Sequence, residues 1–262
     1  MRKSDFEKVK TLGRGGFGEA VLVRDKEKND VYVLKRVGIN SKRDLKLAIS
    51  EAQLLRSLKH PNIIRYIDHF IEFETDGIIN LYLVMEYAKC GDLRSFMRSR
   101  RKMLSERVVA LLMMQMAVSI SHCHRQNIMH RDLKPENIFI SSAGILKLGD
   151  FGLAREISEE TIMARTRCGT AAYIAPEVIR DRPYSFSCDM WSLGCIAYEL
   201  LMLKHPFREK NAFATVQRVL HGRPKVALLT NNKNKTLALI VNQLLQVNVR
   251  IFFCSFCLLL HS

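Results

Sequence analysis

The chain has 262 residues, of which 48% are hydrophobic and 26% charged, and its formal net charge is +15 at pH 7. These values suit one core or two modest lobes, and they exclude several independent domains or a largely disordered chain. The positive charge predicts attraction to an anionic partner such as acidic protein, phosphate or nucleic acid. It does not select nucleic acid, because the sequence has no basic run with interleaved aromatic residues.

Seven cysteines lie scattered along the chain. An odd, unpatterned set argues against the disulfide framework of a small secreted protein. The N-terminus lacks the apolar core of a signal peptide. The uncharged stretch 251–260 is too short to span a bilayer. We therefore expect a protein without a membrane span in the reducing cytoplasm, with the nucleus or the cytoskeleton as alternatives.

The first ninety residues predict a β-rich part with one helix. Apolar residues recur at helical spacing from Leu45 to Leu58, Ser41 is available as the N-cap, and His60-Pro61-Asn62 ends the pattern. Strands are expected within 11–24 around a glycine turn, and at 31–36, 63–74 and 81–87, with a turn at Asp76-Gly77.

Helices are expected to predominate after residue 95. The segment 108–120 is apolar nearly all round and predicts a buried helix, in which Met113, Met114 and Met116 fill the core. Residues 187–203 predict a second buried helix, and His122-Cys123-His124 is expected to form a surface cluster at a helix end. The two parts should meet near residues 88–91.

A glycine-rich segment near the N-terminus, Gly13 to Gly18, matches G-x-G-x-x-G. Dinucleotide-binding folds use the same pattern between a strand and a helix, whereas here a second β-rich run follows, so the turn should join two strands. Glycines let the backbone approach phosphate groups closely. Lys35 ends an apolar strand, where an unpaired ammonium is costly, and Glu51 on the next helix offers a partner. The alternative is that these are two unrelated surface charges.

Three further segments follow in a fixed order: the run His130 to Asn137 (HRDLKPEN), Asp150-Phe151-Gly152, and Ala175-Pro176-Glu177. The occurrence of all three in this order by chance is negligible. From about residue 5 to 248 the chain resembles a eukaryotic protein kinase. Lys134 and the run Gly169-Thr170-x-x-Tyr173 are typical of the serine/threonine type. The strings at 137–139, 147–149, 153–155 and 244–248 resemble the NIMA-related (NEK) kinases most.

This resemblance implies an α+β, bilobal protein-kinase fold as a single domain over residues 1–262. The N-lobe should extend to about residue 88 and the C-lobe from 89 to 248, followed by an atypical tail at 249–262. Relatives continue beyond Asn248 with an arginine that pairs with the glutamate at the position of Glu177, and this sequence lacks an obvious equivalent. We therefore expect a truncated or alternatively read end and a less stable C-lobe.

The resemblance also implies roles for individual residues in binding ATP and Mg²⁺. Asp132 should orient the substrate hydroxyl, Lys134 should stabilise the γ-phosphate, and Thr170 should bond near Asp132. Asn137 and Asp150 should hold Mg²⁺, and Lys35, held by Glu51, the α- and β-phosphates. The nucleotide-binding residues are expected to be Leu12, Gly13, Arg14, Gly15, Gly16, Phe17, Gly18, Glu19, Ala20, Val33, Lys35, Met85, Glu86, Ala88, Asp92 and Phe139.

Two further features concern regulation and the shape of the site. Arg131 is expected to bind a phosphate on Thr166. Kinases usually carry valine at the position of Ala20 and alanine at that of Val33, so the large and small residues are exchanged here; if both line one roof, the total volume is conserved.

The expected function is transfer of the γ-phosphoryl group of ATP to serine or threonine hydroxyls of proteins. A catalytically weak kinase-like binding protein and a basic nucleic-acid binder are the alternatives. The sequence sets neither the substrate nor the oligomeric state.

Overall fold

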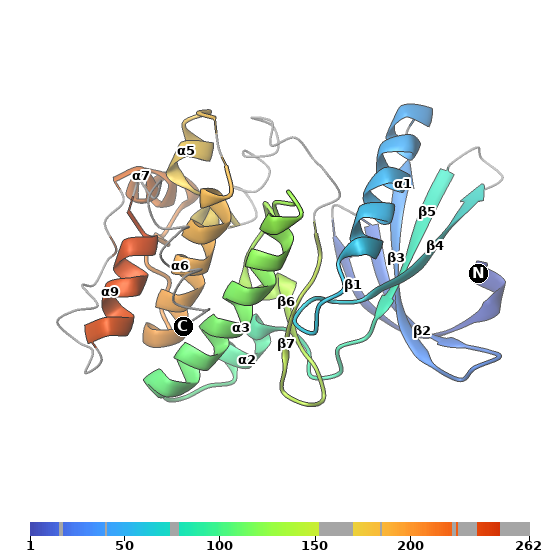
Figure 1. The fold of residues 1–262 in the computed structure, drawn as a ribbon, viewed down its shortest axis with the longest axis horizontal. Coiled ribbons are helices and arrows are strands. Elements are labelled where there is room, and N and C mark those ends of the chain that lie inside the picture. Colours follow the sequence, from blue (N-terminus) through green and yellow to red (C-terminus); the bar gives the residue numbers. More distant parts are fainter. Residues whose placement is uncertain are drawn as a thin grey trace.

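The computed structural model describes residues 1–15, 18–39, 41–73, 79–151, 170–183, 185–221, 224 and 235–246, without the side chains of residues 14, 15, 42, 51, 170, 171 and 235. A β-sheet with one helix forms one part, and a mainly helical assembly forms the other (Figure 1). This arrangement confirms the predicted α+β fold with two lobes. In the described ranges no helix combines the length and the apolar character that crossing a bilayer requires.

The N-terminal part is built on a five-stranded antiparallel sheet with the order β1-β2-β3-β5-β4. A short 3₁₀ segment at Lys3–Asp5 precedes it. The strands are β1 (Phe6–Gly15), β2 (Gly18–Asp25), β3 (Val31–Ile39), β4 (Tyr66–Phe73) and β5 (Ile79–Glu86). The turn expected at residues 76 and 77 lies outside the described residues.

Strand β4 begins three residues later than the sequence pattern predicted. Ile63 forms an isolated bridge with Leu148, and the backbone N–H of Ile64 donates to the carbonyl of Leu148 at 2.8 Å. These residues therefore tie the sheet to the helical part instead of extending β4.

Helix α1 (Lys42–Ser57) is the one predicted between Leu45 and Leu58. The hydroxyl of Ser41 accepts from the backbone N–H of Asp44 at 3.1 Å, which confirms the predicted N-cap. Ala48 and Ala52 are buried in a cluster that includes Leu81 and Leu83 of β5, and Leu45 and Leu55 pack against it. Helix α1 therefore packs on the sheet (Figure 1).

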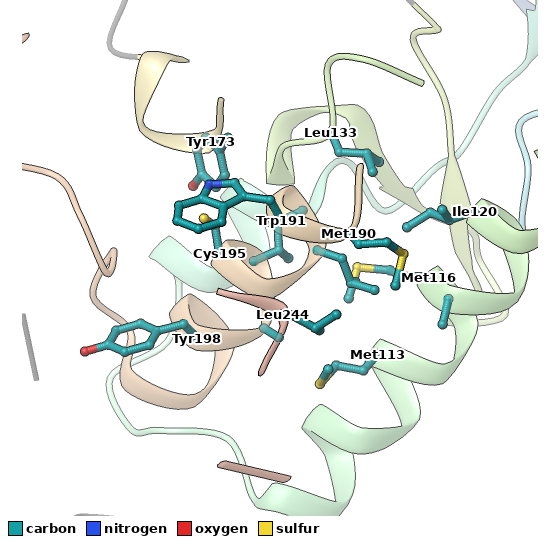
Figure 2. Close-up of a cluster of buried hydrophobic side chains, with 14 of the residues drawn as sticks. Met113, Met116, Ile120, Leu133, Tyr173, Met190, Trp191, Cys195, Tyr198 and Leu244 are labelled. Atoms are coloured by element: carbon teal, nitrogen blue, oxygen red, sulfur yellow. The ribbon is translucent and has the colours of Figure 1, made fainter. Parts of the chain in front are cut away.

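The helical part surrounds α6 (Ser187–Met202). The other helices are α2 (Leu93–Arg98), α3 (Glu106–Arg125), α5 (Pro176–Ile179), α7 (Ala212–His221) and α9 (Lys235–Leu244). Two 3₁₀ segments, Pro135–Asn137 and Thr170–Tyr173, and a two-stranded sheet of β6 (Ile138–Ile140) and β7 (Leu146–Leu148) complete it. Figure 2 shows Met190 and Trp191 of α6 in the same core as Met116 and Ile120 of α3.

The two helices expected to be buried differ. Every residue of α6 from Cys188 to Leu201 is buried, as predicted. Helix α3 buries Met113 and Met116, but Met114 is 49% exposed. The prediction of all-round burial, and of a core position for Met114, is wrong because α3 packs on the core by one face only.

The histidine-cysteine-histidine run at the end of α3 is also not the surface cluster that was expected. Cys123 and His124 are buried, and the Nε2 atom of His124 lies 2.7 Å from the Oδ2 atom of buried Asp189. Cys123 and His124 therefore face the core of the helical part, whereas His122 is only partly buried.

Candidate active site

A cleft of about 470 Å³ lies between the sheet and the helical part. Both parts and their connection contribute to its lining, which consists of Lys10, Leu12, Gly13, Ala20, Val33, Lys35, Ile64, Met85, Glu86, Tyr87, Ala88, Lys89, Gly91, Asp92, Phe139 and Asp150. Most nucleotide-binding residues expected from the sequence are therefore brought together in one place.

One end of this cleft brings together the apolar side chains that were expected to bind adenine. Leu12, Ala20 and Val33 come from the sheet, and Phe139 comes from β6. Since Ala20 and Val33 line the same cleft, the exchange of a large and a small residue occurs within one wall, as the volume argument requires.

The connection between the two parts is held at its beginning by Glu86. The backbone N–H of Glu86 donates to the carbonyl of Arg65 at 2.9 Å. Its carboxylate accepts from the backbone N–H of Arg65 at 3.0 Å and lies 2.9 Å from the Nζ atom of Lys147. These contacts fix the connection beside β4 and β7, so that Met85, Glu86 and Ala88 present one side to the cleft.

The glycine-rich segment joins two antiparallel strands, and the pairing continues to Gly15 opposite Gly18. This confirms the predicted turn between strands. Gly18 has a φ of +119°, and a Cβ atom there would lie 1.8 Å from the carbonyl oxygen of Arg36, so only glycine fits. Residues 16 and 17 and the side chain of Arg14 lie outside the described residues.

Two residues of the expected nucleotide set are not among the described residues that line the cleft. Glu19 accepts from the hydroxyl of Thr11 at 3.3 Å and lies 3.8 Å from the Nζ atom of Lys8. It therefore lies with the side chains of β1. Gly18 supports the turn through its close approach to β3.

An ion pair between Lys35 and Asp150 crosses the cleft. It joins Lys35 in the middle of β3 to Asp150, two residues beyond the end of β7. The prediction that Lys35 ends its strand is wrong, because β3 continues to Ile39. Asp150 has a φ of +52°, and the preceding Gly149 is tightly packed, since a Cβ atom there would lie 2.7 Å from Ile64. The lysine expected to be near Asp150 is thus in place. The side chain of Glu51, its expected partner, lies outside the described residues.

Asp132 is the centre of the run at residues 130–137, which the resemblance to kinases predicts to be the catalytic loop. Its Oδ2 atom accepts from the Nζ atom of Lys134 at 2.8 Å and from the side-chain amide of Asn137 at 3.0 Å. The same amide nitrogen donates to the backbone carbonyl of Asp132 at 2.8 Å. The backbone carbonyl of Asn137 in turn accepts from the N–H of Gly149 at 2.9 Å, so the loop also positions Asp150.

Buried Asp189 of α6 holds the catalytic loop by hydrogen bonds to the loop backbone. Its carboxylate accepts from the backbone N–H groups of His130 and Arg131, each at 2.9 Å, and lies against His124. Burial would raise the pKa of Asp189, but the hydrogen bonds and charges of His124 and His130 outweigh it and lower that pKa below its usual value. Arg131 has a φ of +64°, a strained conformation that these bonds hold.

A second buried network joins the catalytic loop to the segment at 170–173. The guanidinium of Arg94 lies 2.8 Å from Glu136 and 2.5 Å from Glu199, and it also bonds to the hydroxyl of Tyr173. Burial and the charge of Glu199 raise the pKa of Tyr173. Sequence reasoning missed this network and Asp189, because a single charged residue within an apolar helix does not show its partner.

The remaining predicted site residues differ in where the structure places them. Asp92 lines the cleft, but its carboxylate also caps α2 by accepting from the backbone N–H of Ser95 at 2.8 Å. Arg131, Asp132 and Tyr173 line a separate small cavity beside Asp189. Thr166 and the side chain of Thr170 lie outside the described residues.

Sequence reasoning also missed several residues that line the cleft, namely Lys10, Ile64, Tyr87, Lys89 and Gly91. The period of two along a strand places Lys10 on the face of Leu12, and this signal could have found it. Ile64 comes from a segment without such a period, so no pattern marked it.

The donor set of the cleft suits Mg²⁺ bound together with a nucleotide. Mg²⁺ is usually held by one or two carboxylates plus substrate phosphates, and by few protein ligands. Asp150 supplies a carboxylate to the cleft. Asn137 is not among the residues that line it; its amide nitrogen bonds to Asp132, and its backbone carbonyl accepts from Gly149, the residue before Asp150. No group of three or more His, Cys, Asp or Glu side chains among the described residues could hold a metal by itself.

The model of the protein kinase domain matches residues 6–250. The chain belongs to the protein kinase family. The serine/threonine-protein kinase Nek5 of Mus musculus is 36% identical over 246 residues, which cover 93% of this chain and 38% of that protein. Nek4 of Mus musculus is 37% identical over 86% of this chain and 29% of its own length, and Nek2 of Homo sapiens is 39% identical over 79% and 48%.

These relatives confirm the resemblance to serine/threonine kinases of the NIMA-related group. Kinases of this type use ATP with Mg²⁺. The chain spans only about a third to a half of the length of these relatives.

Proposed function

We propose that this chain is an ATP-dependent protein kinase that phosphorylates serine or threonine hydroxyls of protein substrates. The observation that carries the proposal is the convergence of Asp132, Lys134 and Asn137 beside the ion pair of Lys35 and Asp150. Lys35, the run from Asp132 to Asn137, and Asp150 come from three separate parts of the sequence, and together they supply the charges that phosphoryl transfer requires.

The proposed roles follow from the atoms that each residue presents. Asp132 accepts the proton of the substrate hydroxyl and orients that hydroxyl, and Lys134, 2.8 Å from Asp132, stabilises the developing charge. Asp150 and Asn137 would hold Mg²⁺. Bound ATP with Mg²⁺ supplies the phosphoryl group and part of the charge neutralisation. Positioning of this kind can contribute about 7–11 kcal/mol toward the barrier.

The remaining site residues are proposed to bind the nucleotide. Lys35, with Glu51 as its partner on α1, would grip the α- and β-phosphates, and the glycine-rich segment would cover them. The adenine would lie among Leu12, Ala20, Val33 and Phe139, with its edge at the backbone of the connection. We propose that Thr170 bonds near Asp132.

Regulation by phosphorylation is part of this proposal. Arg131 precedes Asp132 and is held by Asp189, and we propose that its guanidinium binds a phosphate on Thr166. Phosphatase-treated wild type and Thr166→Ala are incubated with ATP before assay. The wild type should gain activity and the variant should not; equal activity would remove this role.

We also propose how the chain is divided into lobes and in which cellular compartment the protein acts. A single kinase domain over 1–262 would comprise an N-lobe to about residue 88, a C-lobe over 89–248 and a tail at 249–262. The interval between the end of β5 at Glu86 and the start of α2 at Leu93 supports this boundary. Among the described cysteines, Cys90, Cys123, Cys188 and Cys195 are free thiols, which favours the reducing cytoplasm.

The decisive experiment measures transfer of radiolabelled phosphate from ATP to a basic protein substrate. Wild type is compared with Asp132→Asn and with the control Asp181→Asn, an exposed aspartate with a φ of +51°, which asparagine tolerates. The Asp132→Asn variant should lose about 10²–10⁴-fold in rate, and the control should not. If wild type binds ATP but transfers no more phosphate than Asp132→Asn, the chain is a kinase-like binding protein.

A further inference from the structure

The turn between α2 and α3 carries a cluster of positive charge, which we call the basic turn. It comprises Arg98, Arg100, Arg101 and Lys102, all exposed. Arg100 lies over the ring of Phe96, with 4.4 Å between the guanidinium carbon and the ring centroid. Within the part of the chain that the structure describes, none of the four forms an ion pair.

Some basic residues elsewhere lie close to a carboxylate. Lys3 lies 3.6 Å from Glu72, and Lys147 lies 2.9 Å from Glu86. Arg218 lies 2.5 Å from Glu209. In the basic turn four cations gather within five residues, and none of them forms an ion pair with a carboxylate of the described residues, which leaves a local field that an acidic ligand would complement.

An exposed apolar stripe begins directly after the basic turn. It comprises Met103, which is 65% exposed, and Val108, Leu111 and Met114 of α3, which are 39%, 49% and 49% exposed. At about 100° per residue the three helical positions fall within one arc of about 120°. Figure 1 shows that the turn leads from α2 into the N-terminal end of α3, so the charge and the stripe adjoin.

Single exposed apolar residues are normal on a protein surface. Four within twelve residues, beside an unbalanced cluster of cations, are a combination typical of an interaction surface. We propose that the basic turn and the apolar stripe together bind an acidic segment of a partner protein that carries apolar side chains beside its carboxylates.

The composition of the surface favours an acidic protein over a nucleic acid. Single-stranded nucleic acids are held by stacking on exposed aromatic rings, and the stripe consists of aliphatic and thioether side chains. None of the residues of the turn or the stripe is among those that line the nucleotide cleft. The basic turn and the apolar stripe therefore form a surface that is separate from the nucleotide site.

The size of the surface sets the length of a suitable probe. From Glu106 to Met114 the helix rises about 12 Å, which about four extended residues cover. A fluorescein-labelled synthetic peptide of about five glutamates followed by leucine, serine and phenylalanine spans the turn and the stripe together. Its binding to the purified chain is measured by fluorescence anisotropy at low and at physiological salt. The electrostatic contribution to the affinity should weaken as the salt concentration rises.

Matched variants separate this surface from general charge attraction. The variant Arg101→Glu/Lys102→Glu should lower the affinity for the peptide at least tenfold, whereas Lys28→Glu/Lys59→Glu, which reverses two exposed charges elsewhere, should not. Equal losses in both would overturn the proposal. All four positions are exposed, so folding should be unaffected, which unfolding curves check.

The stripe is tested in the same way. The variant Leu111→Gln/Met114→Gln should weaken binding, and Phe213→Gln/Leu239→Gln, at exposed apolar positions of α7 and α9, should not. A peptide of glutamates alone that binds as tightly as the full probe would overturn the role of the stripe. Tighter binding of single-stranded DNA or of vesicles containing phosphatidylserine, with the same dependence on Arg101 and Lys102, would assign the surface to another class of ligand and overturn the proposal.

Discussion

The two sides of the cleft are held in place by different means. On the helical side, Asp132 is fixed by Lys134 and Asn137, and the loop that carries it is bonded to Asp189, which is fully buried. On the sheet side, Lys35 reaches across by an ion pair to Asp150, whose side chain is 35% exposed. The helical side is therefore part of the core, whereas the contact from the sheet side depends on how the two parts meet.

This difference predicts that substitutions on the helical side affect folding and activity together. Asp189→Asn should have the largest effect, because one amide oxygen cannot replace a carboxylate that accepts from His130, Arg131 and His124. Removing one member of such a buried network costs about 3–5 kcal/mol of the free energy of unfolding. Urea unfolding measures this loss.

The exposed Asp181→Asn is the matched control, since it makes the same chemical change without burial. It should change the free energy of unfolding by less than about 0.5 kcal/mol. If Asp189→Asn unfolds at the same urea concentration as this control, the helical side is not held by the core in the way described.

On the sheet side, Lys35→Met should reduce activity without unfolding the chain. Loss of one positioned cation costs about 10²–10³-fold in rate. Ion pairs that reach solvent contribute only about 0–1 kcal/mol to stability, so the unfolding midpoint should barely move. Kinase assays check the loss of activity, and urea unfolding of the same preparation checks that the midpoint is unchanged. A loss of stability as large as that of Asp189→Asn would show that the two sides of the cleft are not held by different means.

The same division explains how much could be predicted from the sequence. Asp132, Asn137 and Asp150 were found because the runs that carry them occur in the order that is typical of protein kinases, and this resemblance can be seen without any knowledge of packing. Asp189 and Arg94 were not found, since their importance comes from partners that are distant in the chain and only become neighbours on folding.

The helices show the same limit. Both α3 and α6 are rich in apolar residues, and the mean composition predicted that both are buried. Helix α6 is surrounded by other elements, whereas α3 lies at the surface with Leu111 and Met114 exposed. Composition does not say how many neighbours a helix has. In strands, the resemblance predicted the cleft-lining Leu12 and Ala20, whereas the period of two that places Lys10 on the face of Leu12 was not used.

Substitutions in the roof of the cleft should have a smaller effect, because the shape of the roof depends on the volumes of the side chains at positions 20 and 33 and not on their charge. The double variant Ala20→Val/Val33→Ala restores the usual arrangement and conserves volume, so nucleotide affinity should change by less than about 1.5 kcal/mol. Ala20→Val alone adds volume and should weaken binding more. Titration with ATP measures both, and weak binding by the wild type that Val33→Ala rescues would show that the roof obstructs the nucleotide.

The contact that joins the two parts should give the smallest effect, and it depends on pH. The rings of His60, which follows α1, and His122 of α3 lie with centroids 5.0 Å apart, and the Nδ1 atom of His60 accepts from the backbone N–H of Asn62 at 3.1 Å. Burial and the positive charges of His122, Arg125 and Lys147 hold the pKa of His60 below its usual value of 6.5.

A histidine with a lowered pKa in the folded state binds fewer protons there than in the unfolded chain. Its contribution is therefore fully present above pH 6.5 and is lost as the pH falls through the folded-state pKa. The wild type should lose more stability than His60→Gln between about pH 7.5 and pH 5.5, as measured by urea unfolding, with His221→Gln at an exposed position as the control. Equal losses in wild type and His60→Gln would show that the joint between the two parts does not sense protons at this position.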